Sequence, residues 1–192
     1  VGVQVEPQRT WRSVAAGLFH TCAIDSQNAL FCFGNAEMGQ IPTLNENRVG
    51  LTEINVPPLQ SVQTYLATTC GLTLNDELIC YGDNSFGQLA TGQVRNLYGS
   101  VQVALNAPGE GDAKSIAAGS SHTCVTTASG DMLGCFGRNF DRQIDSASRP
   151  FFTPTWIPQN PHVRILSLGD SHSCAITTPW QLTCWGSNYR GQ

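Results

Sequence analysis

The chain has 192 residues, of which 41% are hydrophobic and 12% are charged, and its formal net charge is −4 with a pI near 5.4. This hydrophobic content excludes intrinsic disorder by composition, and the acidic balance disfavours nucleic acid and anionic membrane surfaces as partners. The sequence has no apolar run as long as a membrane-spanning helix needs, so we expect no membrane insertion.

Four segments of the chain can be aligned, each on two cysteines. The first cysteines of successive segments are 48, 54 and 50 residues apart. A period near fifty residues with variable inserts is the pattern of a repeat architecture. The aligned segments are 13–40, 61–88, 115–143 and 165–192.

Each segment predicts three short strands in chain order. In the first segment these are Ser13–Gly17, His20–Ile24 and Leu30–Gly34. A polar turn separates the second strand from the third, which predicts a β-hairpin. The Ala-Ala-Gly sequence that ends the first strand predicts close packing, because small residues let neighbouring backbones approach.

The hairpin predicts how the cysteines pair. Residues ten or eleven apart around such a turn can lie directly opposite each other, within reach of a disulfide. Zinc knuckles need closer spacings, so we predict no metal site and an oxidising compartment, with eight free buried thiols as the alternative. The predicted disulfides are Cys22–Cys32, Cys70–Cys80, Cys124–Cys135 and Cys174–Cys184.

Inserts follow the first three segments, and each contains a β-like stretch and a proline. These stretches begin at Leu51, Val101 and Phe151, and they predict an outer, fourth strand with proline at its edge. The inserts are 41–60, 89–114 and 144–164.

The repeated motifs are Ala-Ala-Gly-x-x-His-Thr, at Gly17 and Gly119, and aromatic-Gly-x-x-x-x-Gly-Gln, which ends at Gln40, Gln88 and Gln192. They resemble the regulator-of-chromosome-condensation repeat. The cysteine pairs make the chain similar to the extracellular branch of that family, as in Crinkly-type receptor kinase ectodomains. The resemblance implies an all-β fold: a β-propeller, or a propeller segment, of four blades with one disulfide-stapled hairpin per repeat.

Two units depart from the family pattern. Tyr65 and Thr68 replace Gly and His in the second unit. In the third, Asp141-Arg142 precedes Gln143 where Gly is expected, and one extra residue lies between the cysteines. We expect both units to differ locally in turn geometry.

The expected domain is a single repeat domain over 1–192, with repeats at about 13–60, 61–114, 115–164 and 165–192. The last repeat lacks an insert, whereas residues 1–12 resemble one and are expected to complete it. Three alternatives follow: closure of a small ring, completion of a blade in a neighbouring copy, or a fragment of a longer propeller, since the family usually closes seven blades.

The histidines His20, His122 and His172 recur at one repeat position, which favours structural hydrogen bonds over metal binding or acid–base chemistry. The aromatic residues that follow the second cysteines are expected in the core. These are Phe33, Tyr81, Phe136 and Trp185. No catalytic motif is present, so we predict neither an enzyme nor a cofactor.

The candidate binding residues lie in turns and inserts. Trp180 follows Pro179 at a hairpin tip and is expected either to anchor a partner or to pack on a neighbouring segment. For Trp156, packing of an outer strand is favoured over a ligand site. The remaining candidates are the turn residues Asn28, Asp76 and Asp131.

We expect a secreted, non-enzymatic module that binds protein or self-associates through its variable loops. The alternatives are a carbohydrate-binding lectin, with Trp180 stacking on a sugar, and a proteinaceous enzyme inhibitor. Cysteine pairing and acidity weigh against a nucleotide-exchange or chromatin role like that of the nuclear namesake of the family.

Overall fold

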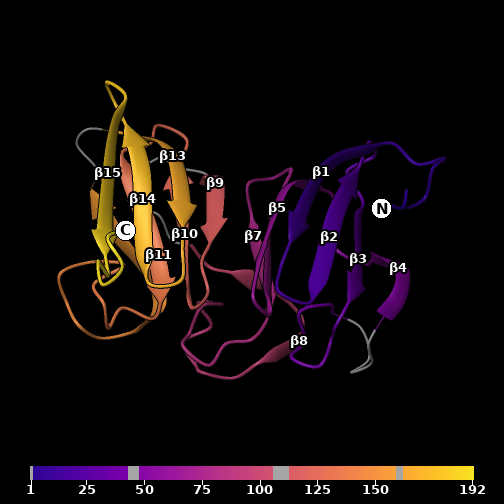
Figure 1. Cartoon of the computed structure of the whole chain (residues 1–192), viewed down its shortest axis with the longest axis horizontal. Helices are drawn as coiled ribbons and strands as arrows, with labels where there is room; N and C mark the ends of the chain where they lie inside the picture. The colour runs from indigo at the N-terminus through magenta and orange to yellow at the C-terminus, as the bar shows by residue number, and fades with distance from the viewer. Residues whose placement is uncertain (1, 43–47, 106–112, 159–161) are drawn as a thin grey trace.

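The computed structural model describes residues 2–42, 48–105, 113–158 and 162–192, which form fifteen β-strands and no helix. The strands make four antiparallel sheets that lie in a row (Figure 1). The first sheet contains β1 (Trp11–Ala16), β2 (His20–Asp25), β3 (Leu30–Gly34) and β4 (Arg48–Ile54). The second contains β5 (Leu59–Tyr65), β6 (Thr68–Thr73), β7 (Leu78–Gly82) and β8 (Leu97–Val103).

The third sheet contains β9 (Ala113–Ala118), β10 (His122–Thr127), β11 (Met132–Gly137) and β12 (Phe151–Pro158). The fourth contains β13 (Val163–Leu168), β14 (His172–Thr177) and β15 (Gln181–Gly186). Strands follow their chain order within every sheet, and the first strands of neighbouring sheets contact each other, β1 with β5, β5 with β9 and β9 with β13. The described residues include no helix that could cross a membrane.

The predicted hairpins and disulfides are confirmed. In every sheet the two cysteines are direct cross-strand partners, for example Cys22 opposite Cys32. Their Cα atoms are 4.1–4.2 Å apart. Each disulfide therefore joins two strands of the same sheet, as the spacing of ten or eleven residues predicts.

The inserts supply the outer strands β4, β8 and β12 of the first three sheets, as expected. The fourth sheet has three strands in this structure, and β15 is its last. No strand is assigned to residues 2–10. Residues 2–10 do not pair with the fourth sheet in this structure, and completion of the fourth unit by residues 1–12 stays a prediction.

The hydrophobic core lies between the sheets. Among the residues that the structure describes, three clusters of buried side chains occur, one at each junction between consecutive sheets. At the first junction the Cys22–Cys32 disulfide and Leu30 pack with Val62 and Tyr81 of the second sheet. The disulfides are thus local covalent links, but their sulfur atoms also form part of the contact with the next sheet.

The aromatic residues that follow the second cysteines also contribute to the contacts between sheets. Tyr81 and Phe136 are fully buried, and Trp185 packs against the third cluster. Phe33, the equivalent residue of the first sheet, is half-buried, because its sheet has no preceding sheet in the structure. Burial at this repeat position thus depends on the neighbouring unit.

Candidate interaction surfaces

A polar link joins each sheet to the next at the end of its third strand. The hydroxyl of Thr69 donates to the Gln40 carbonyl over 2.9 Å, and Thr123 donates to the Gln88 carbonyl over 3.1 Å. These carbonyls belong to the Gly-Gln turns that close the family motif. The hydroxyl residues stand second in the middle strand of the following sheet, so this position is a contact between repeats.

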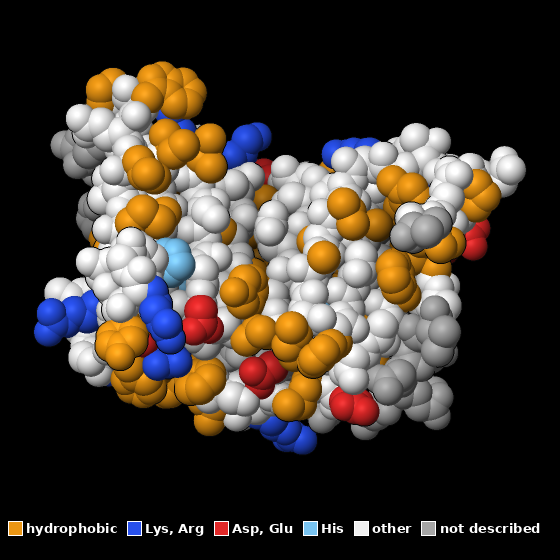
Figure 2. Space-filling view, in the orientation of Figure 1, with side chains coloured by type: hydrophobic (Ala, Val, Ile, Leu, Met, Phe, Trp, Pro, Cys, Tyr) orange, Lys and Arg blue, Asp and Glu red, His pale blue; other side chains and the backbone are white. Residues whose placement is uncertain are grey.

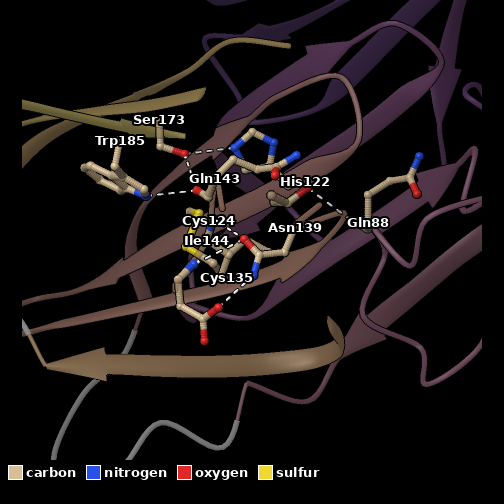
Figure 3. The surroundings of a disulfide bond; sticks show 11 residues. Gln88, His122, Cys124, Cys135, Asn139, Gln143, Ile144, Ser173 and Trp185 are labelled. Carbon is tan, nitrogen blue, oxygen red and sulfur yellow. Dashed lines mark hydrogen bonds between the residues drawn. A yellow bond between two sulfur atoms is a disulfide. The ribbon is translucent and has the colours of Figure 1, made fainter. Parts of the chain in front are cut away.

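The histidines complete two of these links. His20 Nε2 lies 2.8 Å from the Thr69 hydroxyl. His122 Nε2 lies 2.9 Å from the Ser173 hydroxyl, which donates to the Gln143 carbonyl over 2.7 Å (Figure 3). Because each hydroxyl has one proton and gives it to a carbonyl, the imidazole Nε2 is the donor. Both rings thus link one sheet to the next.

Burial explains the protonation state of these rings. Desolvation lowers the pKa of His20 to about 4, with a smaller opposing effect of the Leu66 carbonyl. Desolvation also lowers the pKa of His122 to about 4, and nearby His172 acts in the same direction. Buried neutral imidazoles that bond one hydroxyl have no access to a substrate, so they supply no acid–base site.

The glycine three residues before each histidine makes room for its ring. A Cβ atom on Gly17 would lie 2.6 Å from His20 Nδ1, and one on Gly119 would lie 2.8 Å from His122 Cε1. A Cβ atom on Gly119 would also lie 2.5 Å from the Gly169 carbonyl oxygen, and one on Gly17 3.1 Å from the Leu66 carbonyl oxygen. The Ala-Ala-Gly motif therefore accommodates both an imidazole and the close approach of a neighbouring backbone. This explains why the second unit lacks both motif residues. Because Thr68 has no imidazole ring, Tyr65 can stand where the other units need glycine.

Both departing units differ in turn geometry, but at different turns. The second unit has Leu66 at φ 42° in its β5–β6 turn. The β10–β11 turn of the third unit has six residues between the paired Thr126 and Leu133, whereas the first unit has five between Ile24 and Leu30. In the third unit, Arg142 takes φ 60° where Gly39 and Gly87 have φ 83° and 80°. The Gln143 side chain still accepts from the Asp141 amide at 3.0 Å, as Gln88 does from Phe86 at 2.9 Å. The turn that ends at Gln143 therefore keeps the form of the other units, because Arg142 adopts the left-handed conformation itself, and the expected difference lies in the hairpin turn.

The tips of the β-hairpins contain three of the candidate binding residues. Asn28, Asp76 and Trp180 occupy one turn position, at φ 68°, 61° and 84°, and Gly130 has φ 78° in the third unit. Asn and Asp tolerate this left-handed conformation, so a structural reason suffices for Asn28 and Asp76. Tryptophan has no such tolerance, so this reason does not explain Trp180. The Trp180 side chain is 68% exposed, and the Arg164 guanidinium lies 4.7 Å from its ring centroid.

The other two candidates have partners in neighbouring segments. Asp131 forms an ion pair with His162, and both side chains are about half exposed. Trp156 donates from Nε1 to the Leu105 carbonyl over 2.8 Å, and its ring lies over Gly134. Trp156 thereby packs β12 against the second and third sheets and borders an open groove of about 570 Å³. The structure does not bring the five candidates together into one site.

A different cluster lies at the opposite edge, in the loops that follow the third strands. The Arg138 guanidinium lies 5.7 Å from the Phe86 ring centroid and 5.8 Å from that of Phe140. It also donates to Asp141 over 3.0 Å. We call Phe86, Arg138 and Phe140 the arginine–phenylalanine patch. Figure 2 shows hydrophobic side chains along this edge, which is the lower edge in that view, and at the tip of the β14–β15 hairpin.

Sequence reasoning missed this patch, although a signal was present. Each aromatic-Gly-x-x-x-x-Gly-Gln segment, or its equivalent in the third unit, contains one large apolar side chain between its two ends. These side chains are exposed: Met38 46%, Phe86 37%, Phe140 51% and Tyr189 88%. Recurrence of an exposed apolar residue at an otherwise polar loop is the pattern that could have revealed it.

No group of three or more histidine, cysteine or carboxylate side chains that could hold a metal ion occurs in the described part of the chain. The described residues instead form sheets that are joined by buried hydrogen bonds, with loops along two edges of the molecule. Consecutive four-stranded antiparallel sheets joined through their faces define a β-propeller architecture.

The family to which the chain belongs is identified by its sequence. The model of the regulator of chromosome condensation (RCC1) repeat matches residues 11–40, 61–88, 113–143 and 163–192, which together make up more than half of the chain. The chain belongs to this repeat family. No curated protein matches it significantly over its sequence.

Solved structures share the fold at low identity. Yeast RCC1 (Prp20), bound to Kap60, is 20% identical with a TM-score of 0.84, over 97% of this chain and 46% of that one. The ectodomain of the receptor kinase CR4 from Physcomitrella patens is 22% identical with a TM-score of 0.65, over 98% and 44%. The ectodomain of ACR4 from Arabidopsis thaliana is 19% identical with a TM-score of 0.62, over 95% and 53%. The chain thus spans about half the length of these proteins.

Proposed function

We propose that the chain is an extracellular, non-enzymatic module that binds a protein partner through its loops. The arginine–phenylalanine patch is the observation that most supports this function. Arginine and aromatic side chains are enriched in the energetically dominant parts of protein interfaces. The loops that present them are held by the buried side chains of Gln88 and Gln143, which accept from the Phe86 and Asp141 amides. Little ordering is therefore needed when a partner binds.

Support for a protein partner also comes from the related folds. The solved structures include yeast Prp20 in complex with Kap60, and a second study of Prp20 names Gsp1p and histones. Those partners belong to Prp20. For this chain the loops differ, and we propose only the class of partner, a protein with an apolar or acidic surface that accepts Arg138 between two phenylalanine rings.

An extracellular location is supported by the four disulfides and by the similarity to receptor kinase ectodomains. Protein isolated from its natural source should therefore contain no free thiol when alkylated before reduction. Alkylation of all eight cysteines under those conditions would contradict this location and revive an intracellular role.

The binding function is tested by changing the patch. The immobilised chain should retain a protein from the extracellular fluid of its source, and the purified partner should then be titrated by calorimetry. We expect the Phe86→Ser/Phe140→Ser double variant to bind at least about tenfold more weakly, since interface aromatic residues often contribute 1–2 kcal/mol or more each. Leu74→Ser is the matched control, because Leu74 is 52% exposed at a hairpin tip on the opposite edge.

Undiminished binding by the double variant would contradict the proposed site. A carbohydrate-binding function predicts instead saturable binding on a glycan array that Trp180→Ala abolishes. Loss of an enzyme partner's activity on binding would identify the module as an inhibitor, and turnover of a substrate by the chain itself would overturn the non-enzymatic assignment.

A further inference from the structure

The loops that follow the third strands of the first two sheets share one side-chain contact at their base. In the loop 35–40, Gln40 Nε2 donates to Asn35 Oδ1 over 2.7 Å. In the loop 83–88, Gln88 Nε2 donates to Asp83 Oδ2 over 3.0 Å. The first residue of each loop thus supplies the acceptor for the side-chain amide of the last residue, and both glutamines are buried.

The equivalent loop of the third sheet, 138–143, begins with a residue that has no acceptor. Arg138 stands at the first position, and a guanidinium group only donates. The Gln143 side chain is fully buried, and its Nε2 group has no hydrogen-bond partner among the described residues. Its Oε1 atom still accepts from the Asp141 amide over 3.0 Å, so the side chain keeps the orientation that it has in the other two loops.

Two further donors at the base of this loop are also unpaired. Arg138 Nε and Ser121 Oγ are both buried, and neither has a partner in the part of the chain that the structure describes. Ser121 lies against the start of the loop, because its carbonyl accepts from the Arg138 amide over 2.7 Å. The residues at this position in the first two units are Phe19 and Ala67, which have no hydroxyl group. Together with the Gln143 amide, the third unit thus has three side-chain donors that lack an acceptor.

The second loop shows which group satisfies donors of this kind. The Asp83 carboxylate accepts from the Gln88 side-chain amide and from the Ser85 hydroxyl. The third loop has an amide and a hydroxyl as well, and a guanidinium in addition, but no carboxylate of its own at that position. Unpaired buried donors are costly, and an ionised carboxylate is the acceptor that binds a guanidinium most strongly.

Two carboxylates of the chain lie near these donors and have other partners. Asp141 accepts from Arg138 Nη2 over 3.0 Å, and both side chains are about one-third exposed. Asp170 of the next sheet accepts from the hydroxyls of Ser120 and Ser171. An ion pair at the surface is weak, so another carboxylate can replace Asp141 on Arg138.

We propose that the loop 138–143 binds an aspartate or glutamate side chain of the protein partner, whose carboxylate fills the role that Asp83 has in the second loop. Arg138 is the exposed member of the donor set, so the carboxylate meets its guanidinium first. Rotation of this flexible side chain then admits the carboxylate to the Gln143 amide. The rings of Phe86 and Phe140 flank the guanidinium and limit its contact with water, which strengthens the ion pair.

This inference rests on the proposed function, because it names the chemical group that the arginine–phenylalanine patch recognises. It uses the second, third and fourth sheets, all of which the chain contains. The carboxylate site can nevertheless be tested without the partner, so its failure and the failure of the proposed function are distinguishable.

The first test uses acetate as the probe and the ¹⁵N-labelled chain. We expect saturable shifts of the Arg138 Nε–H and Gln143 side-chain amide signals in nuclear magnetic resonance spectra, and none with chloride at the same ionic strength. In Arg138→Asn the Gln143 shift should vanish. Asparagine also restores the acceptor of the first loop, so this variant should unfold at a higher urea concentration than the original chain.

Arg142→Asn is the matched control, because it removes the same charge from an exposed residue of the same loop and asparagine tolerates its φ of 60°. It should bind acetate like the original chain. The site is overturned if acetate causes no shift in the original chain, if chloride causes the same shift, or if Arg138→Asn retains the Gln143 shift.

The second test uses the purified partner. Arg138→Asn should bind it at least about tenfold more weakly, since the partner's carboxylate loses its counter-charge. Asp141→Asn should bind it more tightly, because the competing carboxylate is removed. Unchanged binding by Arg138→Asn, or weaker binding by Asp141→Asn, would overturn the carboxylate site. If Phe86→Ser/Phe140→Ser still weakens binding in that case, the proposed function stands without this site.

Discussion

The inter-sheet histidines and their glycines act as pairs of residues rather than as separate positions. Gly17 gives His20 room to lie against the turn, and His20 donates to Thr69 of the next sheet. In the second unit both members change together, to Tyr65 and Thr68, and Thr68 donates instead to the Asp83 carbonyl of its own sheet over 3.1 Å. The departure therefore replaces a link between sheets by one within a sheet.

This pairing predicts energetic coupling between Gly17 and His20. Gly17→Ala should lower the free energy of unfolding by about 1–3 kcal/mol, because the methyl group overlaps the imidazole. Removing the ring relieves that overlap. The Gly17→Ala/His20→Thr double variant should therefore lose less stability than the sum of the single variants, by about 0.5–3 kcal/mol.

Urea unfolding of the four proteins in this cycle measures the coupling. Gly99→Ala is the control, because no atom lies within 4 Å of a Cβ at that glycine and it should change stability by at most about 0.5 kcal/mol. If the losses of stability at Gly17 and His20 are additive, the His20 ring is not the reason that position 17 needs a glycine.

At the scale of the strands and sheets, the junctions combine apolar packing with one buried polar link. The carbonyl of Gln143 accepts both the Ser173 hydroxyl and, over 2.9 Å, the Trp185 Nε1–H group (Figure 3). A buried carbonyl that accepts two donors from the next sheet fixes the relative position of the two sheets more closely than apolar contact does. The Gly-Gln turn is thus a connector between repeats as well as a loop.

These links make stability dependent on pH. The pKa of His20 and His122 is lowered to about 4 in the folded chain, whereas unfolded imidazoles titrate near 6.5. Between these values the unfolded state binds more protons, so the free energy of unfolding should fall as the pH drops from 6.5 to 4. The loss is up to about 3 kcal/mol for each histidine, and it is absent above pH 7.

Thermal melts at several pH values measure this loss. His122→Gln keeps a side-chain donor for Ser173 but does not titrate, so it should reduce the loss by about half. His162→Gln is the control, because His162 lies at the surface in an ion pair with Asp131. An equal loss in the original chain and in His122→Gln would refute the role of this histidine.

The sequence predicts the elements well, because their signals are local. The cysteine spacing and the polar turns predict all four hairpins, and the prolines of the inserts predict the outer strands. Whether a given repeat position is buried, by contrast, depends on the neighbouring sheet and not on the local sequence. Leu182 and Leu30 occupy the same position, yet their exposure is 72% and 1%, since only Leu30 has a following sheet against it.

The candidate site could be predicted only in part for the same reason. Trp180 is exposed at a hairpin tip, as its neighbour Pro179 suggested. The arginine–phenylalanine patch, however, needs Phe86 of one repeat beside Arg138 of the next, and this proximity depends on how the sheets are stacked. Residues that lie 52 positions apart give no pattern within a single repeat.

At the scale of the whole molecule, the chain is a row of four similar sheets whose cores lie between them (Figure 1). Stability in such a stack comes from contacts between neighbours. The exposed disulfide Cys174–Cys184 lies in the fourth sheet, on which no later sheet packs in this structure.

The accessibility of this disulfide tests the account most directly. The chain would be treated with a mild reductant, alkylated, and the labelled cysteines identified by mass spectrometry. Cys174 and Cys184 should be labelled before the other six cysteines, which are fully buried between sheets. Earlier labelling of a buried pair such as Cys70 and Cys80 would contradict the account.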